Sequence, residues 1–437
     1  MRGRAPHRAR QARVADAPPA LTGTLLPAMA LVVQKFGGSS VADAERIRSV
    51  ARRVAERHRA GDSVVVVVSA MGSTTDELIA MAEQVSPQRH PREMDMLVTA
   101  GERISMALLA MAIRDHGVEA VSLTGSQAGI LTDARHGAAK IEKITPFRVR
   151  EGLDAGRVVI VAGFQGVAPD TKEVTTLGRG GSDATAVALA AALMADSCEI
   201  YTDVDGVFTA DPRIIPEARK LAEVSFEEML ELSASGARVL MLRSVELGAR
   251  YGIPIHVRSS FHDQDGTWVR DPTMEEAVVS GIAHDTSAVK VAVARVPDRP
   301  GVAASLFEPL AAAAVNVDMI VQNAAADGTT DISFTVPAEH AGEALRIATE
   351  VAARLGAGAA TLDDHIAKVS VVGAGMRSAP GVAAKMFAVL AAADINIQMI
   401  STSPIRVSAV IDAEHVDRAV RSLHVAFDPP TPPTEEA

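Results

Sequence analysis

The sequence predicts an α/β domain with a largely parallel sheet covered by helices, followed by two small α+β modules. From Leu31 onward, β-branched runs such as "LVVQKF" alternate with Ala, Leu and Arg patterns of helical spacing. The run "SVVVVV" is apolar without alternation, as expected for a strand whose two faces are both covered by helices. In the last third of the chain, one unit occurs twice, starting at Pro300 and at Pro380.

The expected elements follow in this order along the chain. After the strand "LVVQKF" we expect helices at 43–60, at 74–85 and around 94–115, with the strand "SVVVVVSA" after the first of them. The strands "RVVIVAGFQG" and "CEIYTDVDGV", separated by an Ala-rich helix, continue the pattern. Each repeat reads strand, Pro-Gly turn, helix and strand. The expected boundaries are 29–270 for the α/β domain, 271–287 for a linker, 288–365 and 366–430 for the two modules, and 431–437 for a tail.

Composition and charge indicate a globular protein that handles small molecules. The chain has 437 residues, of which 48% are hydrophobic. A formal net charge of -11 argues against nucleic-acid and membrane-surface roles, because those partners are usually met by a basic face. No apolar stretch reaches about 18 residues without a charge or a breaker, so we expect no membrane span. The single Cys198 indicates a buried, inert thiol and a reducing, cytoplasmic location.

The first 28 residues are rich in Arg, Ala and Pro and lack the apolar core of a secretory signal. Met29 stands immediately before the first expected strand. We therefore expect residues 1–28 to be a disordered extension or the product of an over-long start assignment, with an organellar leader as the alternative.

The stretch "KFGGSS" places a lysine before a glycine pair, the reverse of the P-loop order. Gly37 and Gly38 allow backbone N–H groups to turn toward an anion, and Lys35 would place an ammonium beside the same oxygens. The stretch therefore suggests a phosphate site. The alternative is an ordinary glycine turn with a solvated lysine.

A second glycine cluster, "TTLGRGGSD", stands at the entry of an Ala-rich helix. Ser182 or Asp183 would be a suitable N-cap for that helix. A structural cap needs only one residue, whereas Arg179 beside the glycines adds a clamp for a carboxylate or phosphate. We therefore favour a second anion-binding loop.

Two further stretches carry acids, one after a predicted strand and one before an amphipathic helix. "YTDVDGVFTADPR" lacks the remaining ligands of a calcium loop, and its place after a strand suits a nucleotide site, although its acids could be merely solvated. Glu102 in "TAGERIS" could bind a substrate ammonium or could be an acid at a helix N-terminus. The histidines show no metal-ligand spacing, so no protein-bound metal is expected.

The stretch "VSVVGAGMRS" resembles a dinucleotide-binding fingerprint, with Asp394 in the place of a ribose-binding acid. The match fails at Ser378, where the third glycine should stand. The sister repeat reads "VPDRPG" at the same place, so we assign this turn to the architecture of the module.

The motifs "KFGGSS", "SAMGSTTDEL", "TAGERIS", "TGSQAG", "AGFQG", "TTLGRGGSD", "YTDVDGVFTADPR" and "SGARVL" occur in this order and resemble aspartokinase of the amino-acid-kinase fold. The tandem repeats resemble ACT domains, which are ferredoxin-like amino-acid sensors, and the arrangement is similar to the actinobacterial type regulated by lysine plus threonine. The resemblance implies transfer of the γ-phosphoryl of ATP, with Mg²⁺, to the β-carboxylate of L-aspartate. The product, 4-phospho-L-aspartate, would begin lysine, diaminopimelate, threonine and methionine biosynthesis.

The resemblance also assigns site residues. Lys35, Arg179 and Asp183 would be catalytic, with Asp183 orienting Lys35. ATP would contact Lys35, Phe36, Gly37, Gly38, Ser39, Ser69, Thr202, Asp203, Phe208, Thr209, Ala210, Asp211, Pro212, Arg213 and Arg238. Aspartate would contact Ser73, Thr74, Thr75, Glu102, Arg179, Gly180, Gly181 and Ser182, with Arg179 on its α-carboxylate and Glu102 on its α-ammonium. Ser73 and Arg238 depart from the Asp and Lys common in relatives.

For the repeats, the resemblance implies effector sites beside the Pro-Gly turns. The candidates are Asp298, Gly301, Asn316, Asp318, Gln322 and Asn323 in the first copy, with Gly381, Asn396 and Gln398 in the second. The alternative for Asn316 and Asn396 is that they terminate helices. Pro404 replaces a Glu usual in the family and would remove a backbone N–H from an expected strand.

The resemblance also implies an assembly and leaves two alternatives. A separate small subunit could start at Met274, and pairing of module edges would give a homo-oligomer or an α2β2 assembly. No nucleic-acid or membrane partner is expected. The alternatives are another carboxylate or carbamate kinase of the same fold, or a sensor without catalysis.

Overall fold

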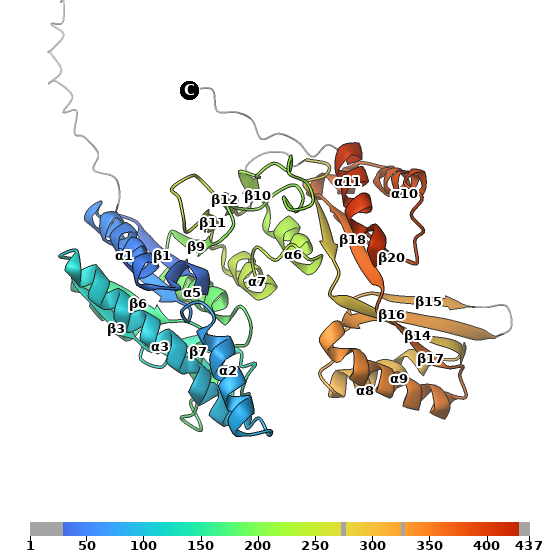
Figure 1. Cartoon of the computed structure of the whole chain (residues 1–437), viewed down its shortest axis with the longest axis horizontal. Helices are drawn as coiled ribbons and strands as arrows, with labels where there is room; N and C mark the ends of the chain where they lie inside the picture. Colours follow the sequence, from blue (N-terminus) through green and yellow to red (C-terminus); the bar gives the residue numbers. More distant parts are fainter. Residues whose placement is uncertain (1–28, 272–276, 325–327, 428–437) are drawn as a thin grey trace, which may run out of the picture.

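The computed structural model describes residues 29–271, 277–324 and 328–427. The expectations for residues 1–28, Met274 and 431–437 lie outside the described residues. Figure 1 shows an N-terminal domain, drawn blue to green, with two smaller modules, drawn yellow to red, beside it. We refer to residues 29–271 as the N-terminal domain.

The N-terminal domain is built on an eight-stranded sheet. Every neighbouring pair in it is parallel except β11 with β12, so the expected, largely parallel sheet is confirmed. Its strands in spatial order are β10 (Glu223–Val224), β12 (Thr267–Val269), β11 (Ile255–Ser259), β9 (Ser197–Thr202), β1 (Leu31–Phe36), β2 (Ser63–Val68), β6 (Val158–Ala162) and β3 (Ala120–Leu123). β1 lies between β2 and β9, at the centre of the sheet.

Helices cover both faces of this sheet. One face packs against α1 (Ala44–Arg59) and α3 (Pro91–Asp115), and the other against α5 (Gly181–Leu193), α6 (Phe226–Ala234) and α7 (Leu242–Tyr251). The valines of β2 alternate between the two cores, and all five are fully buried. Burial stabilises the fold by about 1.5–3 kcal/mol for each such side chain, which explains why the strand carries no polar alternation.

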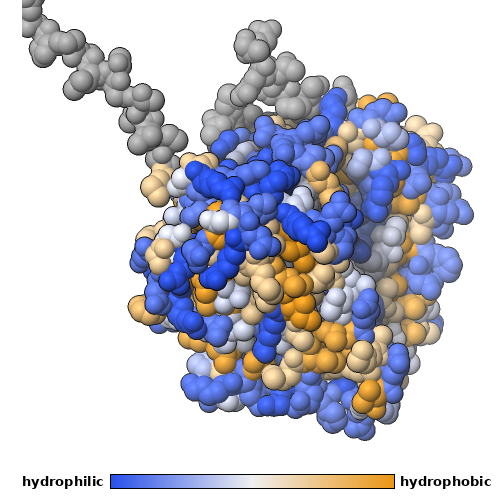
Figure 2. Space-filling model, turned by 60° about the vertical axis from the view of Figure 1, so that its left-hand side comes forward, coloured by the Kyte–Doolittle hydropathy of each residue, from blue (hydrophilic) through white to orange (hydrophobic). Residues whose placement is uncertain are grey.

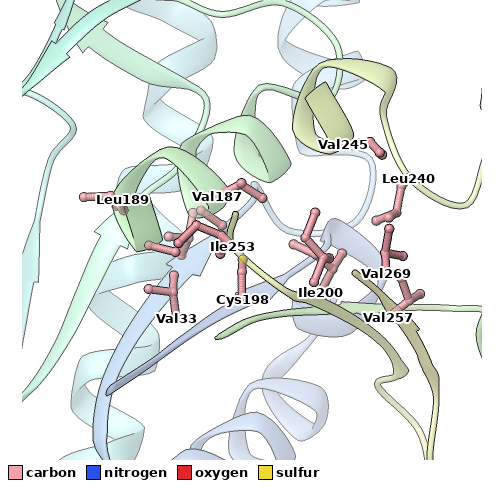
Figure 3. Close-up of a cluster of buried hydrophobic side chains, with 14 of the residues drawn as sticks. Val33, Val187, Leu189, Cys198, Ile200, Leu240, Val245, Ile253, Val257 and Val269 are labelled. Atoms are coloured by element: carbon pink, nitrogen blue, oxygen red, sulfur yellow. The ribbon is translucent and has the colours of Figure 1, made fainter. Parts of the chain in front are cut away.

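The core beneath α5 and α7 contains the only cysteine of the chain (Figure 3). Cys198 lies on β9 among Val33, Val187 and Ile253 and is fully buried. Burial raises the pKa of its thiol well above the usual range. The expectation of a buried, unreactive thiol is therefore confirmed.

The remaining elements of the domain lie around the sheet edges. α2 (Thr74–Val85) has no buried residue and packs on α3, while α4 (Phe147–Asp154) packs against β6. A small sheet contains β5 (Ile141–Ile144), β4 (Ile130–Thr132), β7 (Gln165–Val167) and β8 (Val174–Thr176) in this spatial order. α1 begins at Ala44, where the side chain of Asp43 accepts a hydrogen bond from the Arg46 N–H at 2.9 Å.

Among the described helices, α3 is long and apolar enough to cross a membrane by length and composition alone. Every 18-residue stretch of this helix contains Glu102 and Arg103, so α3 does not contradict the expectation that no such stretch is free of charges. Half of its most apolar 18-residue stretch is buried. The helix packs against α1, β3 and β6. Met96, Ile104, Leu108 and Met111 are exposed on it. Figure 2 brings this side of the molecule forward and shows hydrophobic residues gathered among hydrophilic ones.

The two modules each contain a four-stranded antiparallel sheet with two helices. The first module contains β14 (Ala288–Pro297), α8 (Val302–Ala312), β15 (Ile320–Ala324), β16 (Thr329–Pro337), α9 (Ala341–Leu355) and β17 (Ala360–Asp363). The second contains β13 (Gly281–Asp285), β18 (Ile366–Val372), α10 (Val382–Ala392), β19 (Met399–Ser403), β20 (Arg406–Asp412) and α11 (Val416–Phe427).

β13 corrects one expected boundary. It precedes the first module in the sequence but pairs antiparallel with β18 of the second. The segment 271–287 is therefore not simply a linker, because it supplies the fourth strand of the second sheet. The first module is therefore inserted in the sequence between β13 and β18 of the second. β13 takes the edge of the second sheet that β17 takes in the first.

The glycines of "VSVVGAGMRS" have a structural role. A Cβ at Gly373 would lie 2.3 Å from the carbonyl oxygen of Val278, and one at Gly375 would lie 2.6 Å from that of Ala277. The turn therefore needs glycines because it closes tightly over the backbone that leads into β13. This packing agrees with assigning the motif to the module rather than to a dinucleotide.

A buried carboxylate joins this turn to the N-terminal domain. Glu228 of α6 is 3% exposed, and its Oε2 accepts hydrogen bonds from the N–H and Oγ of Ser225 at 3.1 and 2.8 Å. Its Oε1 accepts from the Ala374 N–H at 3.0 Å and from the Ser280 hydroxyl. Donors from the N-terminal domain and from the second module thus share one carboxylate.

We expect Glu228→Gln to destabilise the protein by about 1–3 kcal/mol, because the amide NH₂ would face donors and leave buried groups unsatisfied. The measurement is the free energy of unfolding in denaturant. The matched control is Glu227→Gln on the same helix, where an exposed carboxylate pairs with Arg377 and little loss is expected. An equal loss in both variants would contradict the role given to Glu228.

Candidate active site

The centre of the site is an ion pair between the two glycine loops. Lys35 is near the carboxyl end of β1, and Asp183 is in the first turn of α5. Lys35 Nζ lies 2.6 Å from Asp183 Oδ1, and both side chains are about nine-tenths buried. The structure thus brings together two residues that are far apart in the sequence.

The first glycine loop, residues 36–41, is folded tightly around the Lys35 ammonium. A Cβ at Gly37 would lie 3.3 Å from Lys35 Nζ, so glycine leaves space beside the charge. A Cβ at Gly38 would lie 2.9 Å from the Ala70 carbonyl oxygen. Ser39 lies in the short 3-10 helix η1 (Gly38–Val41), which forms the second part of this loop and precedes α1. The Ser69 N–H donates to the Phe36 carbonyl at 3.1 Å, so the loop after β2 packs beside it.

The second glycine loop, residues 176–183, leads into α5. Gly180 is the N-cap of α5 with φ +70°, and no side chain caps this helix end. The expectation that Ser182 or Asp183 is the N-cap was therefore wrong, since both are within the first turn. Gly181 begins the helix, and Ser182 packs against Gly163, where a Cβ would lie 2.7 Å from the serine hydroxyl. Arg179 is exposed at the apex of the loop.

Glu102 lies within α3 rather than at its start, because α3 begins at Pro91. The alternative of an acid at the helix N-terminus was therefore wrong. Glu102 is 3% exposed, and its Oε1 accepts the Ala70 N–H at 3.1 Å. Its Oε2 is buried and has no hydrogen-bond partner within the residues that the structure describes. Burial raises the pKa of this carboxyl to about 7.

The loop after β2 also carries the hydroxyl residues expected to bind substrate. Ser73 is exposed at the start of α2, and its hydroxyl donates to Glu77 at 2.5 Å. Thr74 lies beside Gly101, where a Cβ would be 3.6 Å from its methyl group. Thr75 follows in the first turn of α2. Because Gly101 adjoins Glu102, this loop and the buried carboxylate lie next to each other.

The loop after β9 holds part of the expected nucleotide set. The Thr202 hydroxyl donates to Asp203 at 3.1 Å, and the Phe208 backbone bridges to Lys220. Asp211 accepts three side-chain hydrogen bonds from the exposed Arg213, and these hold the pKa of Asp211 below its usual value. Pro212 is exposed between them. Arg238 is exposed and lies 3.9 Å from Asp285 of β13.

Thr209 and Ala210 do not face this edge of the sheet. Thr209 is fully buried, and its hydroxyl lies 3.0 Å from Nε2 of His424 in α11 and accepts the Arg219 N–H at 3.0 Å. Ala210 is in the hydrophobic core of the second module. The sequence pattern could not show this, because the packing partners come from the far end of the chain.

The expected effector residues lie on matching parts of the two modules. Gly301 and Gly381 are the N-caps of α8 and α10, with φ of +94° and +95°. The neighbouring and following residues Asp298, Asn316, Gln322, Asn323 and Asn396 are all exposed. Asn316 and Asn396 do not terminate the helices, since the left-handed residues after α8 and α10 are Ala314 and Asp394.

The two modules exchange reciprocal lysine contacts. Lys290 of β14 donates to Gln398 of the second module, while Lys368 of β18 donates to Asp318 of the first at 2.5 Å. Lys368 is 4% exposed and also donates to the Ala234 carbonyl of α6 at 3.1 Å. Two expected effector residues, Asp318 and Gln398, therefore lie at the junction between modules. No motif in the sequence indicated the role of Lys368, a single lysine in an apolar strand.

Pro404 lies in the turn between β19 and β20 rather than in a strand. The expectation that it removes a donor from a strand was therefore wrong. Its turn adjoins the Ser403 hydroxyl, which donates to Glu231 of α6 at 2.7 Å.

Within the described residues, no three or more His, Cys, Asp and Glu side chains are grouped closely enough to hold a metal ion.

Comparisons with known proteins agree with this architecture. Residues 30–259 match the model of the amino acid kinase family, and residues 289–351 and 369–427 match that of the ACT domain. The domain and its site thus define an amino acid kinase with ACT modules. The chain is 59% identical over 405 residues to the aspartokinase of Mycolicibacterium smegmatis, covering 91% of this chain and 96% of the relative. It is 55% identical to the aspartokinase of Corynebacterium glutamicum, again over 91% of this chain and 96% of the relative. The chain belongs to the aspartokinase family and is an aspartate kinase.

A solved structure supports the same fold. The structure of E. coli aspartokinase III in complex with aspartate and ADP has a TM-score of 0.78 at 25% identity, covering 91% of this chain and 99% of that one. The same enzyme with lysine and aspartate, in its T-state, has a TM-score of 0.73 at 26% identity and covers the same shares.

Proposed function

We propose that this chain transfers the γ-phosphoryl group of MgATP to the β-carboxylate of L-aspartate and forms 4-phospho-L-aspartate. The observation that carries the proposal is the Lys35–Asp183 ion pair between two glycine loops at the end of the central strand. Open α/β sheets bind ligands at the carboxyl ends of their strands. The related aspartokinase III with aspartate and ADP supports the choice of reactants.

The chemistry requires little more than positioning and charge neutralisation. The β-carboxylate is ionised near pH 7, so the nucleophile needs no general base. The barrier is the repulsion between two anions, and an ammonium and backbone N–H groups reduce it as charge shifts in the transition state. Lys35 supplies the ammonium, and Asp183 fixes its position. Gly38 and Ser39 supply N–H groups, whereas the Gly37 N–H donates to the Tyr201 carbonyl oxygen at 3.3 Å and Gly37 contributes space beside the ammonium.

Magnesium is proposed to enter with ATP. Mg²⁺ in such sites is usually held by one or two carboxylates together with substrate phosphates and water, so it does not need a cage of protein ligands. Thr202, Asp203, Phe208, Asp211, Pro212, Arg213, Arg238, Phe36 and Ser69 remain candidates for the nucleotide side. Thr209 and Ala210 leave this set, because both are buried against the second module.

Aspartate recognition is proposed to depend on opposite charges. The unpartnered Oε2 of Glu102 is an acceptor for the α-ammonium, and Arg179 is a fork-shaped donor for the α-carboxylate. Ser73, Thr74, Thr75, Gly180, Gly181 and Ser182 would complete the pocket. Arg238 and Ser73 retain hydrogen-bonding groups at the positions where they differ from relatives.

This assignment predicts a pH dependence. Burial raises the pKa of the Glu102 carboxyl from its ordinary value of 4.5 to about 7, so the folded protein keeps this carboxyl protonated between these pH values. Ionised Glu102 is needed for the ammonium, so kcat/KM for aspartate should rise about tenfold per pH unit below pH 7 and level off above it. The measurement is a pH profile from 5.5 to 8.5. A profile that is flat across pH 7 would contradict the role of Glu102.

Incubation of the protein with ATP, Mg²⁺, aspartate and hydroxylamine tests the reaction. We expect aspartyl hydroxamate to form only with all components present. Folded protein that yields no product above the blank would favour a sensor without catalysis. Product from another carboxylate but not from aspartate would favour a different kinase of the same fold.

We propose that the reaction begins lysine, diaminopimelate, threonine and methionine biosynthesis in the cytoplasm, with feedback through the modules. Asp298, Gly301, Asn316, Asp318, Gln322, Asn323, Gly381, Asn396 and Gln398 are the candidate effector residues. The lysine complex of aspartokinase III supports an effector role for lysine. We expect lysine plus threonine to inhibit more than either alone, since two ligands can bias one closed state. Additive or absent inhibition across a concentration grid would argue against joint control.

We propose assembly through the module edges. β15 and β19 are edge strands of their sheets, and Ile320 and Ile400, at matching positions in the repeats, are about half exposed. A small subunit that started at Met274 would include β13 and therefore carry both complete sheets. Sedimentation of the full chain with and without the separately expressed segment 274–437 distinguishes a homo-oligomer from an α2β2 assembly.

A further inference from the structure

Arg179 stands between two glycines that cannot hold its side chain. Gly178 has φ +76° and Gly180 has φ +70°, both in the left-handed region. Neither neighbour has a side chain that could restrict the direction of the arginine. The direction of Arg179 therefore depends on the groups that pack against the backbone of the second glycine loop.

The beginning of α7 makes two of these contacts. A Cβ at Gly180 would lie 2.0 Å from Met241 Cγ, so Met241 packs directly against that glycine. Arg243 Nη1 donates to the Leu177 carbonyl oxygen at 3.2 Å. These contacts fall on either side of Arg179 in the sequence.

Arg243 also holds the neighbouring wall of the loop. Its Nη1 donates to the Ala139 carbonyl oxygen at 3.2 Å, and the Ala139 N–H donates to the Thr176 carbonyl at 2.8 Å. One guanidinium thus fixes two adjacent backbone segments. Within the described part of the chain, both hydrogen bonds that Arg243 donates go to backbone carbonyl oxygens, so this arginine holds the backbone and does not form an ion pair.

The surroundings of Arg243 strengthen these bonds. The guanidinium is half-buried, and burial lowers its pKa from the ordinary value. Asp133 and Glu246 act on it as opposite charges and Arg135 as a like charge. Hydrogen bonds from a charged donor in a partly desolvated place are stronger than exposed ones.

We propose that Arg243, together with Met241, is a positioning residue that sets the direction of Arg179 and so determines the affinity for the substrate α-carboxylate. The proposal rests on the proposed function, in which Arg179 binds aspartate. Arg243 does not contact the substrate itself. Both bonds come from Nη1, whose two N–H groups are fixed in the guanidinium plane, whereas a lysine ammonium has rotatable donors on a flexible stem and would hold the two carbonyls less firmly.

Steady-state kinetics of Arg243→Gln and Arg243→Lys test the proposal. We expect KM for aspartate to rise about tenfold or more in Arg243→Gln, because small displacements of a positioning group have large effects. KM for ATP should stay within about twofold, since the contacts lie on the aspartate side of the site. Arg243→Lys should fall between Arg243→Gln and the unchanged protein. Arg250→Gln is the matched control at the end of the same helix, where the guanidinium lies over Tyr251.

The outcomes separate this proposal from the proposed function. If the protein without substitutions forms no aspartyl hydroxamate, the proposed function is refuted, and this proposal is refuted with it. An active unchanged protein whose KM for aspartate stays the same in both Arg243 variants would overturn only the proposal. A similar rise in KM for aspartate and in KM for ATP, together with a lower thermal stability, would show a general structural role and would also overturn the proposal. If Arg243→Gln fails to fold, the KM values of Arg243→Lys decide.

Discussion

Replacement of Lys35 by alanine should lower turnover by about 100- to 1,000-fold, because one lost donor to the developing charge costs about 3–4 kcal/mol in such sites. Lys35 is held 2.6 Å from Asp183 and stands beside Gly37, where the phosphates are proposed to bind. KM for aspartate should change much less, since the ammonium acts on the transferring group. The measurement is the rate of hydroxamate formation at saturating substrates.

Control variants test whether the loss is specific to Lys35. Lys143→Ala removes an exposed lysine of β5 and should leave turnover unchanged. Asp183→Asn should lower turnover by a smaller factor than Lys35→Ala, and the double variant should lose less than the two separate losses combined, because both residues act as one unit. A folded Lys35→Ala variant with a near-normal rate would remove Lys35 from the mechanism.

Replacement of Glu102 by glutamine should raise KM for aspartate by about 30-fold, equivalent to about 2 kcal/mol for a lost hydrogen bond to a charged group. Glutamine keeps the shape of the side chain and can still accept the Ala70 N–H. It lacks the negative charge, and its NH₂ can face the substrate ammonium. The measurement is KM for aspartate and for ATP at pH 8, where Glu102 is ionised.

Glu93→Gln is the matched control on the same helix, because Glu93 is exposed and pairs with Arg92 at the surface. We expect no change in KM for aspartate in this variant. Glu102→Gln should also remove the rise of kcat/KM up to pH 7. Retention of normal aspartate affinity in Glu102→Gln would show that the ammonium binds elsewhere.

The sequence predicted those parts of the fold in which local pattern and packing agree. The valine run became β2 because both of its faces are covered, and helix 74–85 has the bounds that its pattern predicted. The repeat unit predicted two similar modules because each copy carries its own core. These features depend on neighbouring residues, so periodicity alone reveals them.

Features that depend on distant partners could not be predicted in this way. β13 is too short for its pattern to show that it joins a strand in the second module across an inserted domain. Thr209 and Ala210 belong to the loop that follows β9 in the sequence, yet their partners are in α11 and in the core of the second module. α8 ends at Ala312, and the left-handed residue that follows it is Ala314 rather than Asn316.

The same division applies to the site. The glycine loops and their charged residues were visible as motifs, and their resemblance to aspartokinase related them to one another. The burial of Glu102 and its unpartnered oxygen were not visible, because they depend on the packing of α3 against the loop after β2. The contacts of Arg243 with two carbonyl oxygens also left no signal in the sequence, since any backbone oxygen can accept such a bond.

A crystal structure of the protein with L-aspartate and a non-hydrolysable MgATP analogue tests the central claim most directly. We expect the α-ammonium within hydrogen-bond distance of Glu102 Oε2, the α-carboxylate against Arg179, and the γ-phosphate beside Lys35 Nζ. Aspartate bound only between the two modules, with Glu102 Oε2 still unpartnered and Lys35 remote from the phosphates, would contradict it.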